Sequence, residues 1–553
     1  MDEHNSIGAP PVPAAFEFTY EKPIDSIRVT ASSTEMLSRL VDVFTVDNPQ
    51  YFFLQQKGGI EADETFSAIT PLGSFRTGLF PLVYNAALRL AGGDRSRISI
   101  PEGERKQIAD RVFPLRGMFE EPYEVESPFE GYPLRWYQRD AVAALMSHGR
   151  GIVVSPTGSG KSLMIATLVS EIRKRGFPKM GGRNRILLVV PTRQLVDQMA
   201  KDFEDYGLGD VCRFTSDSGS KRKGTFTDNS CSGGFANLIV TNHAWILEKH
   251  GRAGFPKNEI GCVIADEVHT VRRGTKILRV MRKFKTPLRF GFTATLPEYQ
   301  MDRWVNFGMF GMKLFDCSIA RLQGEGYLSR LRIVPIRCRI ADLNPLMPFS
   351  TSDRRLKLGA MLPDGTTVEV GTAYSMELAF MEECCRSLWR PVFEAIGRDF
   401  DFGKGNMVVL FDRTAVGRAL VGMLGEMFPS ASVHFIDGSV DVADREETRS
   451  GLEASSGNIL VAQTVTASVG LNVKNLHGIV FAFSGRSHVR VVQSIGRVIR
   501  KNSGKTVATL YEVWYNTRYS TKHHQDKVEI LTENYGPESF GKTIDVEART
   551  DNG

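Results

Sequence analysis

The loop Ser-Pro-Thr-Gly-Ser-Gly-Lys-Ser at positions 155–162 constrains the fold more than any other segment. It follows the apolar run 152–155 and precedes a helical pattern over 163–173, which predicts a strand, a tight loop and a helix in succession. Backbone N–H groups of such a loop wrap phosphates at the positive end of the helix. The predicted nucleotide-binding residues of the loop are Pro156, Thr157, Gly158, Ser159, Gly160, Lys161 and Ser162.

Three of these residues have separate predicted roles. Gly160 permits close approach of the backbone, Lys161 reaches the β- and γ-phosphates, and the Ser162 hydroxyl ligates Mg²⁺. The general motif opens with glycine where this chain has Ser155, which is a small departure. The loop therefore predicts a nucleoside triphosphate site with Mg²⁺.

A second strand-like run, Cys262–Asp266, ends in two adjacent acids. Phosphoryl transfer needs one carboxylate on the metal side and one on the water side. We assign Asp266 to Mg²⁺ and Glu267 to polarising the attacking water, with His269 two residues further on. An isolated acid pair after a strand is mostly structural, but after a phosphate loop it indicates a nucleoside triphosphatase.

A helical segment, 489–500, contains Gln493, Arg497 and Arg500 at spacings of four and three. These residues share one face of a helix, and Gly496 removes a side chain beside them. Alone they would be a basic surface stripe. With a phosphate loop elsewhere in the chain, they predict arginine fingers that stabilise charge on the γ-phosphate.

From residue 134 onward, short apolar strands alternate with longer amphipathic helices, which predicts parallel sheets covered on both faces. The strand-like runs form two series, 152–293 and 407–513, so we expect two doubly wound α/β domains in tandem. Ahead of them, a mixture of strands and helices predicts a small α+β domain. The expected boundaries are 1–125 (with 1–14 disordered), 126–318, 319–545 and a tail at 546–553; the segment 342–370 is an insertion or long loop.

Composition excludes some classes of protein. The sequence contains no run of 18 apolar residues, so no membrane-spanning helix is predicted. The N-terminus lacks the basic region and the apolar segment of a secretory signal peptide. The seven cysteines contain no CxxC pair, so they predict neither a zinc knuckle nor a disulfide framework, and a cytoplasmic location is expected. The net charge of +6 is modest, but residues 471–530 contain ten Lys or Arg and three acids. That excess fits nucleic acid once other signals point to it.

Together these elements resemble the superfamily 2 helicases, whose two ATP-binding domains are RecA-like. The segment 134–138 is similar to the family's adenine-reading segment, which implies ATP binding by Arg135 and Gln138. The segment 464–472, TVTASVGLN, is similar to the motif that links nucleotide and strand contacts. The resemblance implies that Gly470 binds nucleotide, and that His269, Thr293 and Thr295 couple hydrolysis to movement. It implies nucleic-acid contacts at Pro191, Thr192, Arg193, Thr241, Asn242, Thr464 and Thr466.

Three longer segments, 134–142, 308–333 and 469–514, resemble the UvsW-type helicases of tailed phages. That resemblance implies an ATP-driven DNA motor in the host cytoplasm. It would unwind junctions and R-loops, branch-migrate, regress forks and anneal strands in recombination, repair and replication restart. It implies branched or forked DNA as the main partner, with R-loop RNA and single-strand-binding or recombination proteins as further partners. We expect deletion of residues 1–125 to leave a folded ATPase that binds branched DNA less well.

Alternatives remain open at this point. The motifs of the motor core do not identify a contact to the 2′-OH, which is the group that distinguishes RNA from DNA. An RNA helicase therefore fits these motifs, as does a double-strand translocase of restriction or remodelling type. A non-hydrolysing scaffold would have no need of all five of Lys161, Asp266, Glu267, Arg497 and Arg500. A packaging motor should lack the glutamine–arginine helix. Two apparent sites are interpreted structurally: we expect Cys384 and Cys385 to pack on a helix face, and His523 and His524 to lie in a solvated tail.

Overall fold

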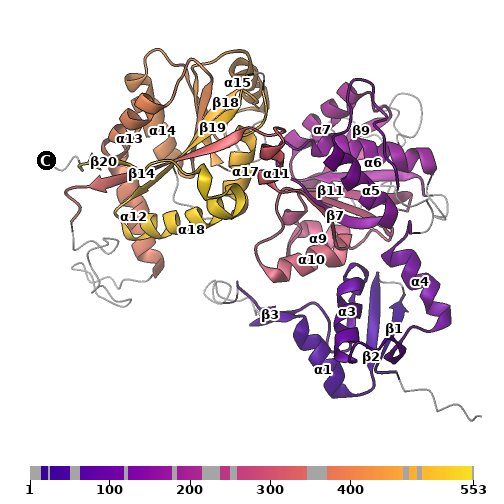
Figure 1. The fold of residues 1–553 in the computed structure, drawn as a ribbon. Coiled ribbons are helices and arrows are strands. Elements are labelled where there is room, and N and C mark those ends of the chain that lie inside the picture. Colours follow the sequence, from indigo (N-terminus) through magenta and orange to yellow (C-terminus); the bar gives the residue numbers. More distant parts are fainter. Residues whose placement is uncertain are drawn as a thin grey trace, which may run out of the picture. The chain divides into compact units, whose positions relative to one another are not determined.

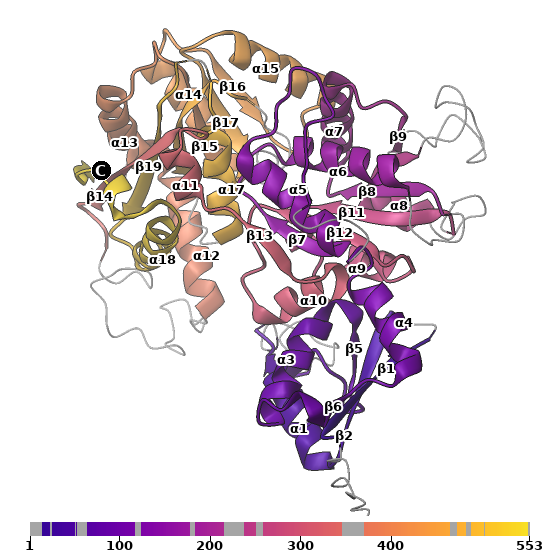
Figure 2. The same ribbon diagram turned by 45° about the vertical axis from the view of Figure 1, so that its right-hand side comes forward.

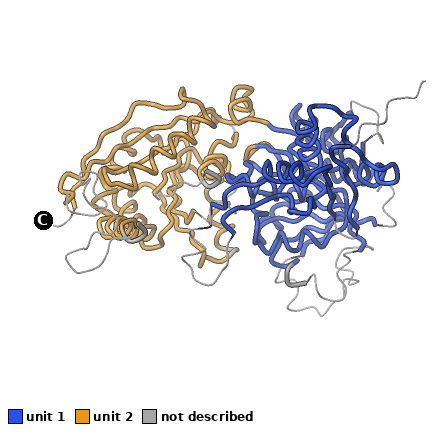
Figure 3. Tube along the Cα trace, turned by 90° about the horizontal axis from the view of Figure 1, so that it is seen from below, with its two compact units in different colours: residues 1–155, 160–316 blue, residues 156–159, 317–553 orange. Residues whose placement is uncertain are grey.

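The structure is a computed structural model, shown from two directions in Figures 1 and 2. It describes residues 14–22, 25–49, 51, 63–116, 123–176, 183–214, 237–249, 258–344, 370–464, 473–482, 488–502 and 504–550. The chain forms two compact units, residues 1–155 with 160–316 and residues 156–159 with 317–553 (Figure 3). Among the described helices, none is both long enough and apolar enough to cross a membrane.

The N-terminal part of the first unit is a four-stranded sheet in the order β5-β2-β1-β6, with helices packed on it. Its strands are β1 (Phe16–Glu21), β2 (Ser26–Ala31), β5 (Ser74–Arg76) and β6 (Ile98–Ser99), and its helices are α1 (Thr34–Val43), α3 (Phe80–Leu90) and α4 (Glu102–Val112). A two-stranded ribbon, β3 (Thr45–Asp47) with β4 (Thr65–Ser67), lies apart from that sheet. Helix α1 begins where the Ser33 hydroxyl accepts the Met36 N–H at 3.2 Å.

The rest of the first unit is built on a seven-stranded parallel sheet in the order β13-β7-β12-β11-β8-β10-β9. Its strands are β7 (Arg150–Val154), β8 (Arg185–Val190), β9 (Val211–Phe214), β10 (Leu238–Asn242), β11 (Ile260–Asp266), β12 (Leu288–Thr293) and β13 (Lys313–Asp316). Its helices are α5 (Trp136–His148), α6 (Lys161–Arg175), α7 (Arg193–Tyr206), α8 (His243–Lys249), α9 (Lys276–Met281) and α10 (Gln300–Phe310). Strands β8, β11 and β12 are buried at every residue, as expected of a sheet covered on both faces.

The second unit contains another seven-stranded parallel sheet, in the order β16-β17-β15-β18-β19-β14-β20. Its strands are β14 (Arg330–Ile340), β15 (Asn406–Phe411), β16 (Val433–Ile436), β17 (Ile459–Gln463), β18 (Leu476–Ala482), β19 (Val507–Tyr515) and β20 (Ile544–Ala548). Its helices are α11 (Ile319–Gly324), α12 (Val370–Glu383), α13 (Cys385–Asp399), α14 (Thr414–Met427), α15 (Val442–Ala454), α17 (His488–Val498) and α18 (Arg518–Tyr535). The predicted fold class, two tandem doubly wound sheets after a small α+β region, is confirmed.

Several local expectations need correction. His523 and His524 lie on α18 and are half-buried, and the His524 ring stacks on Trp514 with centroids 3.7 Å apart, so the predicted solvated tail is wrong. Strand β20 continues the second sheet to Ala548, beyond the expected start of the tail. Cys384 and Cys385 are buried as predicted, but they lie at the junction of α12 and α13.

Cys212 is disulfide-bonded, which the cysteine pattern did not predict. Most of the segment 342–370 lies outside the described residues.

The N-terminal α+β part and the first parallel sheet share a core and a buried ion pair. Trp304 of α10 packs into the N-terminal core, with its ring centroid 5.6 Å from Phe44 and 6.5 Å from Phe66. Arg150 Nη2 lies 2.6 Å from Asp25 Oδ2, and Arg289 Nε lies 3.9 Å from the same oxygen. Deleting residues 1–125 would therefore expose Trp304 and remove the counter-ion of Arg150. That the shortened chain is a folded ATPase stays a prediction.

Candidate active site and nucleic-acid edge

The phosphate loop connects β7 to α6, as predicted. Gly158 and Gly160 have φ angles of +87° and +81°, a region that L-residues with side chains rarely adopt. Gly160 is the N-cap of α6, so backbone N–H groups at the helix N-terminus face the loop. Lys161 Nζ donates to the Ser155 carbonyl at 3.1 Å. The loop therefore has the backbone geometry that its glycines predicted.

Gln138, predicted to read adenine, lies against this loop. A Cβ atom placed on Gly160 would be 2.5 Å from Gln138 Nε2, so glycine at 160 leaves the space that the amide occupies. Gln138 Oε1 accepts the Arg135 backbone N–H at 2.9 Å, and Arg135 Nη1 donates to the Tyr137 hydroxyl at 2.9 Å. The two predicted base-reading residues are thus held together at the start of α5, beside the loop.

The acid pair ends β11, two strands away from β7 in the same sheet. Glu267 has φ +51°, one of two described non-glycine residues with positive φ. Left-handed backbone at a carboxylate costs about 1–3 kcal/mol and is found where the surroundings hold a functional group in place. The backbone thus turns sharply between Asp266 and Glu267, whose N–H donates to Asp266 Oδ1 at 2.9 Å.

The predicted coupling residues form a connected network with Glu267. His269 Nδ1 lies 3.2 Å from Glu267 Oε2 and 3.1 Å from Thr293 Oγ1. Thr293 Oγ1 donates to the Thr295 carbonyl at 2.7 Å, and the Thr293 carbonyl accepts the Ser155 N–H at 2.9 Å. A change at the water-side carboxylate can therefore reach the phosphate loop through side-chain and backbone hydrogen bonds.

The carboxylates fit a divalent cation by their chemistry. Burial, and then the neighbouring Glu267 carboxylate, raise the pKa of Asp266, while the Lys161 cation opposes that rise. Further positive charge would relieve this buried excess of negative charge, and Mg²⁺ prefers oxygen ligands from one or two carboxylates together with phosphates. Ser162 Oγ, the other predicted ligand, is within 2.9 Å of the Tyr206 hydroxyl. Within the described ranges, no cluster of three His, Cys, Asp or Glu side chains forms a separate metal site.

The glutamine–arginine helix is α17, in the second unit. Gln493 is buried and Arg497 is half-buried, and the segment after the helix pairs with the residues that precede β14. Ser329 N–H donates to the Ile499 carbonyl at 2.8 Å, and Leu328 forms a β-bridge with Arg500. The end of α17 is thereby attached to its own sheet.

Sequence reasoning missed Lys505, which anchors the same helix end. Its ammonium donates to the carbonyls of Val498, Leu476 and Lys474 at 2.7, 2.8 and 2.9 Å, and the residue is 2% exposed. Burial, and then the nearby Arg500 cation, lower the pKa of Lys505 to about 7. The signal was a lysine between Gly504 and an apolar strand, which alone resembles an ordinary surface residue.

The predicted nucleic-acid residues of the first unit lie at the carboxyl ends of β8 and β10, which are neighbouring parallel strands. Pro191 is half-buried and Arg193 is exposed beside them. Three of the polar side chains have structural hydrogen bonds: Thr192 Oγ1 accepts the Leu195 N–H at 3.4 Å, Thr241 Oγ1 donates to the Phe214 carbonyl at 2.9 Å, and Asn242 Oδ1 accepts the Trp245 N–H at 3.3 Å. The side chains of these three residues therefore shape the edge of the sheet through hydrogen bonds within the protein.

In the second unit, Thr464 is buried at the end of β17 and donates to the Phe411 carbonyl at 3.0 Å. Gly470 and Thr466 lie outside the described residues.

Known proteins resemble this chain at several levels. The family model described as "Type III restriction enzyme, res subunit" matches residues 131–298. The "ATP-dependent DNA helicase uvsW" of Enterobacteria phage T4 is 26% identical over 404 residues, covering 72% of each chain. The helicase/translocase subunit XPB of transcription and DNA repair factor IIH from Drosophila melanogaster is 27% identical over 220 residues, covering 37% of this chain and 25% of that protein.

Among solved structures, the ATP-dependent Type ISP restriction-modification enzyme LlaBIII bound to DNA aligns with a TM-score of 0.55 and 17% identity. The alignment covers 76% of this chain and 32% of that one, and it supports the tandem-sheet fold alone. The tandem-sheet fold and these relatives support the class of ATP-dependent helicases for this chain. Within that class, the chain is a homologue of the UvsW-like helicases.

Proposed function

We propose that this chain is an ATP- and Mg²⁺-dependent DNA motor acting on branched DNA: junctions, forks and R-loops. The observation that supports the proposal most is the network that joins Glu267 through His269 to Thr293, whose carbonyl bonds Ser155 of the phosphate loop. A protein that only bound nucleic acid would not need an acidic residue with a strained backbone that is connected to a phosphate loop by hydrogen bonds. The relatives named for helicase activity support the same class.

In this proposal the residues act as follows. Loop amides and Lys161 bind the triphosphate, Gln138 and Arg135 contact the base, and Glu267 orients the attacking water. Mg²⁺, held by Asp266 and Ser162, would supply positive charge at the phosphate oxygens. Gln493 and Arg497 of α17, and Arg500 two residues after the end of that helix, stabilise the charge that develops on the γ-phosphate. His269, Thr293 and Thr295 then transmit the change to the strand-end residues that contact the track.

The nucleic acid along which the motor moves, its track, is inferred from the contacts that bind it. Backbone amides and Arg193 meet phosphates, which carry no sequence information, so activity is directed by DNA structure rather than base sequence. We assign this motor activity to the host cytoplasm, where it acts on recombining DNA and on stalled replication forks. Single-strand-binding and recombination proteins are the expected partners there. An RNA track remains an outcome of the test below.

The experiment is junction dissociation by the purified full chain, with ATP and Mg²⁺, on a four-way junction, a fork, an R-loop and linear duplex. We expect ATP-dependent dissociation of the branched substrates, and none with Glu267→Gln. Dissociation of RNA duplexes alone would replace the DNA track by an RNA track. ATP turnover without any strand separation would remove helicase activity from the proposal.

A second candidate, a double-strand translocase of restriction type, is favoured by one observation: the family model that matches residues 131–298 describes a restriction subunit. Displacement of a triplex-forming strand from linear duplex distinguishes this candidate. Triplex displacement without junction dissociation would make it the better description.

A further inference from the structure

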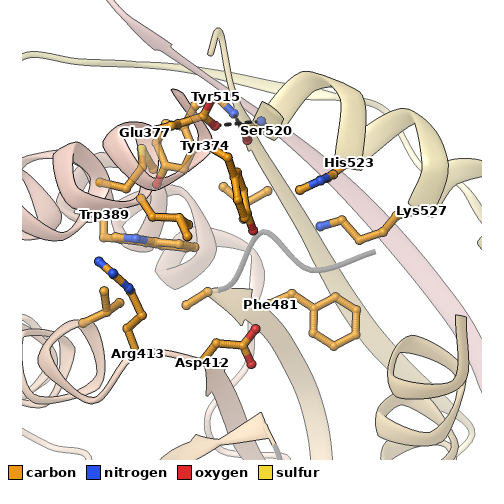
Figure 4. A pocket seen from close by; sticks show the side chains of 15 residues that line it. Tyr374, Glu377, Trp389, Asp412, Arg413, Phe481, Tyr515, Ser520, His523 and Lys527 are labelled. Carbon is orange, nitrogen blue, oxygen red and sulfur yellow. Dashed lines mark hydrogen bonds between the residues drawn. The ribbon is translucent and has the colours of Figure 1, made fainter. Parts of the chain in front are cut away.

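A pocket in the second unit is lined by residues to which no functional role was assigned above (Figure 4). Its cavity volume is ≈ 110 Å³. That is several times the roughly 10–15 Å³ that one water needs, so a small planar group fits. Every residue lining it belongs to the second unit, so the pocket does not depend on the placement of the two units.

The pocket lies where a doubly wound sheet binds ligands. Strands β15 and β18 are neighbours, but the chain leaves β15 toward β16 and leaves β18 toward β19, in opposite directions across the sheet. Ligands of open α/β sheets bind outside the carboxyl ends of the strands at such a switch point. Asp412 and Arg413 after β15, Ala482 at the end of β18 and Tyr515 at the end of β19 line the pocket.

Its walls are aromatic and come from helices on either side. Tyr374 of α12 meets His523 of α18 edge to face, with ring centroids 5.6 Å apart and planes at 78°. Figure 4 shows the Tyr374 ring reaching into the middle of the pocket, with Phe481 below it. Aromatic faces of this kind stack on planar rings and tolerate any base, because every base has a π-face.

One buried cation faces this aromatic space. Lys527 is 2% exposed, lines the pocket and lies 5.9 Å from the centroid of the Phe481 ring. Its Nζ is 2.6 Å from Glu512 Oε1, and an ammonium has three N–H donors, so it can also donate to a ligand carbonyl. In the lining, Asp412 and Glu377 balance Lys527 and Arg413, so no excess of positive charge is present to bind a bare phosphate. The chemistry therefore fits a planar ring with a carbonyl oxygen better than an anion.

The pocket adjoins the strand end where the proposed function expects DNA. The Thr464 hydroxyl bonds to the carbonyl of Phe411, the residue directly before Asp412 and Arg413. Strands β17 and β15 are hydrogen-bonded neighbours, about 4.8 Å apart. A DNA strand that contacts the carboxyl end of β17 is therefore within a few ångströms of the pocket.

We propose that this pocket receives one unstacked base of the DNA strand that crosses the carboxyl edge of the second sheet, with Tyr374 as the stacking platform. The inference rests on the proposed function, because it needs a nucleic-acid track on this edge. The pocket would add a binding site for one base to the phosphate contacts. The DNA strand would then bind the second unit with one nucleotide at a fixed position.

The test uses the full chain and a single-stranded DNA with one 2-aminopurine, moved stepwise along the strand. In the wild type, one position should show a distinct change of fluorescence on binding, and an abasic site there should weaken binding about tenfold. Tyr374→Ala should lose the signal at that position and bind normal and abasic strands equally. Tyr374→Phe should keep both effects, and Tyr299→Ala, at an exposed tyrosine of the first unit, is the matched control.

Thermal melting of each variant checks that it is folded. Equal fluorescence and equal loss at the abasic site in wild type and Tyr374→Ala would overturn the base pocket and leave the DNA motor standing. Failure of the wild type to bind any DNA would instead overturn the proposed function, and the base pocket with it.

Discussion

Asp25 is a largely buried anion that lies against two buried arginines, and replacing it by asparagine should loosen the N-terminal α+β part. The side chains of Arg150 and Arg289 are each 1% exposed, and that of Asp25 is 11% exposed. Burial alone would raise the pKa of Asp25, but the guanidinium groups of Arg150 and then Arg289 outweigh it and hold this pKa well below its usual range. Asp25→Asn keeps the shape of the side chain and removes its charge.

Breaking a buried pair by removing one partner costs about 3–5 kcal/mol, because a buried charge is left without compensation. Here the cost should fall at the lower end, about 3 kcal/mol. Arg150 Nη1 keeps its bond to the Arg111 carbonyl at 3.0 Å, and Arg289 Nε keeps its bond to the Thr286 carbonyl at 3.0 Å. A loss of that size corresponds to roughly a hundredfold change in an opening equilibrium.

Hydrogen–deuterium exchange measures local opening in a large chain where a single unfolding transition is not expected. We expect amides of β1, β2 and α3 to exchange about a hundredfold faster in Asp25→Asn, with β15 and β17 unchanged. The control is Arg28→Gln, which removes the ion pair of Arg28 with Glu21 on the surface. This variant should change the free energy of local opening by less than about 1 kcal/mol. In wild type, the stabilisation from Asp25 should be lost as the pH falls below about 4, because the folded pKa is depressed. Equal exchange in both variants would refute the buried-pair reasoning.

Three further predictions concern the nucleotide machinery, and a fourth concerns the buried Lys505. Lys161→Ala should reduce ATPase to background, and residual turnover near wild type would contradict the phosphate-loop assignment. Glu267→Gln should still bind ATP in a fluorescence titration but not hydrolyse it. Arg497→Ala should lower steady-state turnover by about 10³ or more, the scale of such fingers. In hydrogen–deuterium exchange, the protection of α17 and β18 amides in wild type, relative to Lys505→Met, should rise from pH 7 to 9, because burial lowers the pKa of the folded lysine to about 7 whereas the unfolded lysine keeps its proton. A flat difference across that range would contradict the depressed pKa.

Local patterns in the sequence were sufficient for the two sheets and for the motifs of the nucleotide site. The strand–loop–helix at 155–162 and the apolar run before Asp266 have periodicities that need no distant contact to interpret. The parallel register then brings their carboxyl ends to one edge, which explains why Glu267, His269 and Thr293 meet.

Contacts between distant segments could not be predicted from one sequence. The bond between Asp25 and Arg150, and the packing of Trp304 on Phe44, join parts that no local pattern relates. Lys505 is buried because α17 ends against β18, which is a tertiary fact. The resemblance to helicases implied a nucleic-acid contact for Thr241, but it gave no sign that the Thr241 hydroxyl donates to the Phe214 carbonyl.

The central claim is a DNA motor whose ATP turnover is driven by branched DNA. The most direct test is steady-state ATPase of the full chain without nucleic acid and with single-stranded DNA, linear duplex, a four-way junction and RNA of matching sequence. We predict the strongest stimulation by the junction, with junction dissociation in the same tubes and neither effect in Glu267→Gln. Equal stimulation by RNA or linear duplex, without junction dissociation, would contradict the claim.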